Sequence, residues 1–149
     1  MGKRSIIETK IFKPAFDKLF YIIWIPTSAL MLAATAISAF SLGAFLIMLS
    51  VDIFTFYFLF TSIFSYVELR EHTLFIKFGF IIKREIPYRN IRGLKKERRA
   101  YSETMLSLKN AMEHVVIKYN SFDVVTVSVV GNDELIEEIE ARRENENKS

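Results

Sequence analysis

The architecture of this chain follows from residues 19–67, which read LFYIIWIPTSALMLAATAISAFSLGAFLIMLSVDIFTFYFLFTSIFSYV and contain one charged residue, Asp52. Both flanks are dense in charge, so the stretch has the composition of a membrane segment. A single helix of this length would measure about 73 Å, more than twice a hydrocarbon core of about 30 Å. The stretch is therefore predicted to fold back as a hairpin of two helices.

The turn of the hairpin is predicted at Ser41-Leu42-Gly43, which leaves helices of about residues 19–39 and 44–64. Each then has roughly the 20 residues that a membrane span needs. A turn at residues 50–52 would leave a second helix of only about 15 residues, too short to span. A cleaved signal peptide is the other interpretation of the first helix, because ATAISA offers small residues. An 18-residue polar leader and the second apolar span argue against it.

The positive charges predict the orientation of the hairpin. Basic residues lie in the leader and just after the second helix, whereas the turn has none, and loops rich in Lys and Arg stay in the cytoplasm. We therefore expect a multi-pass protein of the cell membrane with both termini cytoplasmic. The complete absence of cysteine is consistent with a reducing compartment. The basic residues are Lys3, Arg4, Lys10, Lys13 and Lys18 before the hairpin and Arg70 and Lys77 after it.

Asp52 is the polar feature of the hairpin, because a carboxyl group at membrane depth is costly unless it is paired or protonated. Counting outward from the turn places Thr35 as the nearest polar group on the first helix, so Thr35 is the expected partner. The simplest role for Asp52 is to orient the hairpin or an oligomer. A transport or proton-relay role is disfavoured, since two helices offer no machinery for alternating access.

Residues 68–149 change to short alternating runs with the period of β-strands. About six antiparallel strands are predicted, followed by a helix with Asn132 as N-cap, Leu135, Ile136 and Ile139 as its apolar stripe, and Arg142 and Arg143 in its last turn. The first two strands join at residues 70–73. The next four are expected at about residues 81–86, 91–98, 113–119 and 124–130.

These strands carry a resemblance to a known family. The segments are IPYRNIRGLKK, SETMLSLKN, VVIKYN, DVVTVSVV and NDELIEEIEARR, together with Gly79. Over about residues 65–143 they resemble the bacterial pleckstrin-homology-like (PH-like) domain, in the group of small proteins where it follows a two-helix membrane anchor. The resemblance implies an α+β protein whose bent, partly open antiparallel sandwich is capped by the C-terminal helix. Its expected parts are a leader (1–18), a transmembrane hairpin (19–67) and a cytoplasmic domain (68–149).

Enzymatic motifs are missing from the sequence. The five glycines are too dispersed for a phosphate loop or a dinucleotide fingerprint, and there is no nucleophile elbow or paired-histidine zinc motif. His72 and His114 lie far apart without ligand partners at a recognisable spacing. We therefore expect a protein that is not an enzyme and that needs no cofactor or metal.

The leading functional hypothesis is a membrane-anchored interaction module whose PH-like domain binds a protein partner or copies of itself. The resemblance also implies a second hypothesis, self-protection against a membrane-active bacteriocin. A third is a sensor of anionic membrane lipid, and nucleic-acid binding is disfavoured because residues 68–149 carry 15 basic against 14 acidic residues. The candidate lipid- or partner-binding residues are the eight cations of residues 83–99: Lys83, Arg84, Arg89, Arg92, Lys95, Lys96, Arg98 and Arg99. A solvated basic edge without a ligand is the simplest alternative.

Overall fold

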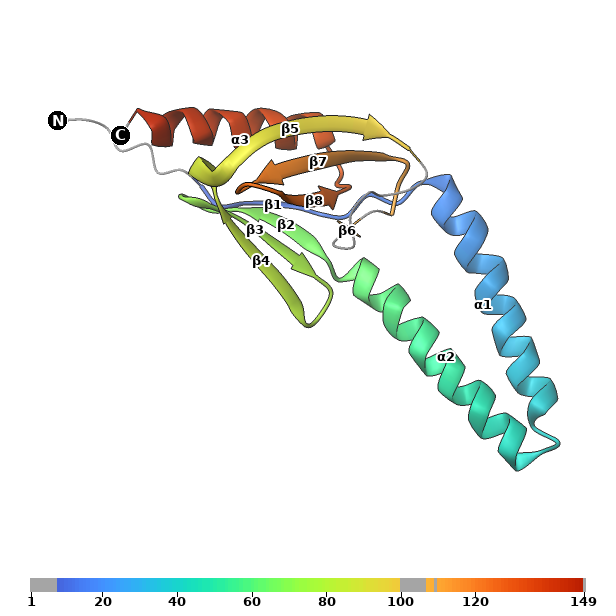
Figure 1. The fold of residues 1–149 in the computed structure, drawn as a ribbon. Coiled ribbons are helices and arrows are strands. Elements are labelled where there is room, and N and C mark those ends of the chain that lie inside the picture. The colour runs from blue at the N-terminus through green and yellow to red at the C-terminus, as the bar shows by residue number, and fades with distance from the viewer. Residues whose placement is uncertain (1–7, 100–106, 109, 149) are drawn as a thin grey trace.

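The computed structural model describes residues 8–99, 107–108 and 110–148. Lys3, Arg4 and most of the SETMLSLKN segment lie outside this range. The described elements are β1 (Lys10–Phe12), α1 (Lys18–Ser38), α2 (Leu42–Ile63), β2 (Tyr66–Leu69), β3 (Thr73–Phe78), β4 (Ile82–Pro87), the 3₁₀ turn η1 (Tyr88–Asn90), β5 (Ile91–Arg98), β6 (Ser107–Leu108), β7 (Glu113–Tyr119), β8 (Asp123–Val127) and α3 (Asn132–Asn147). The predicted α+β class is confirmed (Figure 1).

The helices α1 and α2 form a hairpin that extends away from the sheets. They meet at a turn formed by residues 39–41 and separate toward the β-domain (Figure 1). This turn lies about two residues earlier than predicted, because α2 includes Leu42 and Gly43. Both helices are long and apolar enough to cross a membrane, as far as length and composition decide it.

Two four-stranded sheets form the β-domain, with strand orders β1-β2-β3-β4 and β5-β7-β8-β6. All pairs are antiparallel except β6 with β8, which is parallel. The bounds of β5 and β7 agree with the predicted strands, whereas β1 and β6 were not predicted. β1 belongs to the leader, so the leader supplies an outer strand to the first sheet. Its residues Lys10 and Phe12 lie opposite Leu69 and Val67 of β2.

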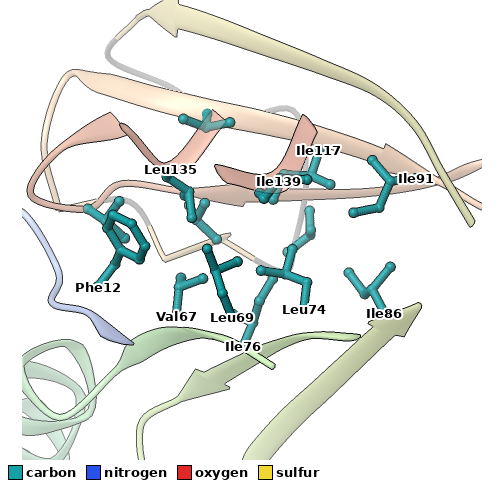
Figure 2. Close-up of a cluster of buried hydrophobic side chains, with 14 of the residues drawn as sticks. Phe12, Val67, Leu69, Leu74, Ile76, Ile86, Ile91, Ile117, Leu135 and Ile139 are labelled. Carbon is teal, nitrogen blue, oxygen red and sulfur yellow. The ribbon is translucent and has the colours of Figure 1, made fainter. Parts of the chain in front are cut away.

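The core lies between the two sheets and beneath α3 (Figure 2). Alternate residues of β2 and β3 are buried in it, as a period of two requires. β3 alternates buried and half-buried residues along its whole length, and β7 likewise buries Val115, Ile117 and Tyr119. Leu135 and Ile139 of α3 are fully buried against these strands, with Ile136 at the margin. The core residues of β3 are Leu74, Ile76 and Phe78.

Two predictions for α3 were wrong. Its N-cap is Gly131, with φ of 87°, and the side chain of Asn132 instead accepts a hydrogen bond from the Val129 amide. The helix also continues to Asn147, so Arg142 and Arg143 do not lie in the last turn. Arg142 is buried instead of serving the helix dipole, because its guanidinium binds backbone carbonyls of the leader and of the turn after β2.

Candidate functional site

The eight predicted cations do not form one continuous patch. Lys83 and Arg84 lie on β4 in the first sheet, Arg89 lies in η1, and the other five belong to β5 and its end in the second sheet. β4 and β5 are the outer strands of their sheets within the described residues, and η1 connects them. The cations therefore lie on one outer strand of each sheet and on the turn that joins these two strands.

Part of the β5 group is engaged in ion pairs. Lys95 Nζ lies 2.7 Å from Glu97 Oε1, and Lys96 Nζ lies 2.8 Å from Asp133 Oδ2 at the start of α3. The hydrogen bond from Lys96 to Asp133 raises the pKa of Lys96, and the one from Lys95 lowers the pKa of Glu97. Lys96 therefore joins the second sheet to α3 and is less available for a ligand. Arg99 also contacts Glu97, at 3.7 Å.

The remaining five cations are exposed, and no ion pair joins them to another of the described residues. They are Lys83, Arg84, Arg89, Arg92 and Arg98. Charged side chains that have no acidic neighbour remain available for an external anion, whether a carboxylate or a phosphate. The sequence identified these residues but did not separate them from the paired ones. The pairing of Lys96 depends on the packing of α3 beside β5, whereas Lys95 and Arg99 both contact Glu97 of β5.

An acidic surface lies on α3. Residues 131–149 contain seven acidic and three basic residues, and Glu137, Glu140 and Glu144 are exposed. Glu138 lies 3.8 Å from Arg142 within α3, and it also binds Lys10 of β1 at 3.0 Å. The domain is therefore polarised, with free cations along β4 and β5 and carboxylates along α3.

The hairpin contains one polar contact between its two helices. Thr35 Oγ1 donates a hydrogen bond of 2.6 Å to Asp52 Oδ2, and both residues are buried. This is the pair expected from the sequence. The other oxygen, Asp52 Oδ1, is buried without a hydrogen-bond partner among the described residues. The contact joins the last turn of α1 to the middle of α2.

Both ends of the hairpin are tied to the β-domain by a short polar side chain. Asp17 caps α1 by accepting from the Phe20 amide at 3.1 Å, and its other oxygen accepts from the Met112 amide at 2.7 Å. Ser65 follows α2, and its hydroxyl accepts from the Gly79 amide at 2.7 Å. Sequence reasoning missed both residues, because their partners are backbone groups brought close only by the fold.

A cavity of about 340 Å³ lies beside the first of these junctions, between the start of α1 and residues 110–112. Phe20, Trp24 and Met112 supply much of its apolar lining, and Asp17 its acidic group. The side-chain nitrogen of Asn110 is buried there without a hydrogen-bond partner in the described part of the chain.

The histidines have separate surroundings. His114 is buried, with Nδ1 2.9 Å from the Met112 carbonyl oxygen, whereas His72 is exposed beside Glu146 at 3.2 Å. Across residues 8–99, 107–108 and 110–148, no three His, Asp or Glu side chains are grouped as metal ligands would be.

Two sheets closed at one end by a C-terminal helix, with an open basic side, define a PH-like domain. The family model described as the bacterial PH domain matches residues 65–143, more than half of the chain, so the protein belongs to that family. No curated protein and no solved structure matches the chain significantly. The matched range begins at Ser65, which means that β1 is an addition from outside it.

Proposed function

We propose that this protein is a membrane-anchored, non-enzymatic interaction module. The helices α1 and α2 hold the bacterial PH domain at the cytoplasmic face of the cell membrane. β1 and β2 pair in one sheet, so the chain leaves and re-enters the same side of the bilayer. The excess of basic residues on both flanks favours the cytoplasmic side.

The observation that carries the proposal is the row of unpaired cations on the outer strands β4 and β5. Outer strands present backbone groups that another chain can pair with, and exposed cations attract acidic partners and guide them to the correct face. The partner of this surface is an acidic protein segment. A second copy supplies such a segment on α3, through Glu137, Glu140 and Glu144, and head-to-tail contacts of this type build larger assemblies.

The test is the molar mass of the full chain, extracted from its native membrane in mild detergent and measured by light scattering at low and high salt. We expect a complex heavier than one chain that dissociates at high salt and in the double variant Arg92→Glu/Arg98→Glu. Mixing this variant with Glu137→Lys/Glu140→Lys should restore the complex if the partner is a second copy. A mass of one chain under all these conditions would contradict the proposal.

Lys118→Glu is the control. It reverses an exposed cation on β7, outside β4, β5 and α3, that makes no ion pair with another described residue, so the mass should not change. Self-protection against a bacteriocin remains a prediction, which the immunity of cells with and without this protein would test.

A further inference from the structure

The turn between β3 and β4 lies against the end of α2. The Gly79 amide donates to the Ser65 hydroxyl, and Gly79 has φ of +63°, a conformation that favours glycine. A Cβ atom at Gly79 would collide with the side chain of Thr61 on α2. The ring of Phe80 then lies 5.3 Å from that of Phe64 and 6.3 Å from that of Tyr57, measured between centroids. The turn is therefore fixed to the helix.

The contact with Tyr57 defines how far the turn reaches along α2. Tyr57 precedes the last residue of the helix, Ile63, by six positions, or about 9 Å along the axis. The turn therefore runs alongside the final turns of a helix that is apolar enough to span a membrane. If α2 spans, residues 79–82 lie at the depth where the hydrocarbon meets the headgroups.

The side chains of the turn fit that depth. Phe80, Ile81 and Ile82 are consecutive and exposed, and Ile81 keeps 76% of its surface accessible. Phe64 is exposed beside them, so the apolar surface continues from the turn onto α2. Contiguous apolar surface of this kind marks a site of contact with a membrane or a partner. Its continuity with a candidate membrane span favours the bilayer.

Two cations lie directly above the apolar turn. Lys77 of β3 and Lys83 of β4 are opposite each other in the register, where like charges repel. No ion pair engages either of them within the described residues. Lys77 Nζ also lies 5.5 Å from the centroid of the Tyr66 ring. An anionic leaflet has negative headgroups at its surface and hydrocarbon below them. Lys77 and Lys83 would face the headgroups, Tyr66 is of a type enriched at this interface, and the apolar turn would face the hydrocarbon.

We propose that residues 79–82 insert into the cytoplasmic leaflet as a third membrane contact, with Lys77 and Lys83 binding the phosphates of anionic lipids. This inference rests on the proposed anchoring by α1 and α2. Its partner is the lipid surface itself. Lys77 is not among the cations proposed to bind a protein, whereas Lys83 belongs to both sets.

The absence of cysteine permits a direct test with single nitroxide labels on the full chain in vesicles. The label sites are Ile81→Cys at the turn, Ile53→Cys on the exposed side of α2, and Phe122→Cys. Phe122 is 96% exposed in the turn between β7 and β8, at the other end of the domain. It is therefore an exposed apolar residue that the proposal leaves in water.

We expect oxygen to reach the Ile81→Cys label better than a water-soluble nickel chelate, as at Ile53→Cys, and the reverse at Phe122→Cys. A label at Ile81→Cys that behaves like the one at Phe122→Cys, while Ile53→Cys is in lipid, would overturn the inference and leave the anchoring intact. A water-exposed label at Ile53→Cys would overturn both the inference and the proposed anchoring by α1 and α2. Dipolar broadening at Ile81→Cys that disappears on dilution with unlabelled chain would assign the turn to a second copy and also overturn the inference.

The lysines are tested by comparing phosphatidylcholine vesicles with and without phosphatidylglycerol. The Ile81→Cys label should lie deeper in the anionic vesicles, and Lys77→Gln/Lys83→Gln should abolish that difference. Lys118→Gln/Lys148→Gln removes the same charge from exposed residues of β7 and the region after α3, and should preserve it. If the Ile81→Cys label lies at the same depth in both kinds of vesicle while Lys77 and Lys83 are both present, the proposed role of the lysines is overturned.

Discussion

The guanidinium of Arg142 donates a hydrogen bond of 2.7 Å to the carbonyl oxygen of Glu8, which lies 134 positions earlier in the chain. The same guanidinium donates to the Arg70 carbonyl at 2.9 Å, and Arg142 is only 5% exposed. The Tyr88 hydroxyl donates to that Arg70 carbonyl as well. One side chain therefore joins the leader, the turn after β2 and α3, and several backbone carbonyls depend on it.

Replacing Arg142 by Met should destabilise the protein by about 2–4 kcal/mol, because hydrogen bonds from a charged donor are lost and buried carbonyls are left unpaired. Arg142→Lys should recover little, since one ammonium group cannot reproduce the planar set of donors. The measurement is the unfolding midpoint of the full chain in detergent. Arg143→Met is the control and should change stability by no more than about 0.5 kcal/mol. Equal effects at the two positions would contradict this account.

Gly79→Ala should destabilise the chain by about 1–3 kcal/mol, because an alanine at φ of +63° is strained and its Cβ meets Thr61. Gly43→Ala is the control, since no atom lies within 4 Å of a Cβ there and Gly43 is inside a helix. Alanine is about 1 kcal/mol better than glycine in a helix, so this control should be neutral or stabilising. Thermal unfolding followed by circular dichroism compares the two variants. A tolerated alanine at Gly79 would mean that the turn does not press against α2.

The hydrogen bond between Thr35 and Asp52 should appear as a coupling energy. In a cycle of Thr35→Val, Asp52→Leu and the double variant, we expect a coupling of about 0.6–1.7 kcal/mol, which spans the average and the maximum measured for hydrogen bonds between membrane helices. Thr27→Val replaces Thr35→Val in the control cycle. Thr27 donates to Ile23 of its own helix, so it should show no coupling to Asp52. Unfolding in mixed micelles gives the free energies. Zero coupling in both cycles would mean that the hydrogen bond between Thr35 and Asp52 does not stabilise the hairpin.

The phenol of Tyr88 should lose its proton at a higher pH than the phenol of an ordinary tyrosine. Burial raises the pKa of its phenol to about 12, whereas a tyrosine in the unfolded chain titrates near 10. Between those values the unfolded state releases a proton that the folded state keeps, so the free energy of unfolding falls as the pH rises through this range. The measurement is the ultraviolet absorbance of phenolate for the native chain minus that for Tyr88→Phe. A difference curve centred near pH 10 would contradict the burial of this phenol.

The sequence predicted the elements whose patterns are local. β7 was placed correctly because its alternating Val115, Ile117 and Tyr119 specify an inward face within one strand. The bounds of β5 were also correct, although its sequence has no such alternation. The α1–α2 hairpin followed from length and charge alone. The pair of Thr35 and Asp52 was found because few polar groups are available at that depth. Its contact was expected even though the turn was placed about two residues too late.

The features that the sequence did not predict are contacts between residues far apart in the chain. The three residues of β1 have no recognisable period, and they form a strand only because β2 is beside them. The ion pair between Lys96 and Asp133 requires α3 to lie along the second sheet. Arg142 is buried because the leader packs against it and accepts a hydrogen bond from it at the Glu8 carbonyl. A cluster of basic residues therefore gave no indication of which cations remain free.

The pairing of β1 with β2 has a consequence for how the protein is made. Lys10 and Leu69 are neighbours in the sheet, but the ribosome completes both helices of the hairpin after β1 and before β2. The nascent β1 therefore has no sheet partner until both helices and β2 have been made. Because such non-local pairings form slowly, maturation of the first sheet should wait for insertion of the hairpin in the membrane-anchored protein that we propose. A chain that fails to insert its hairpin would expose an incomplete sheet, which gives cellular proteases a means of recognising it.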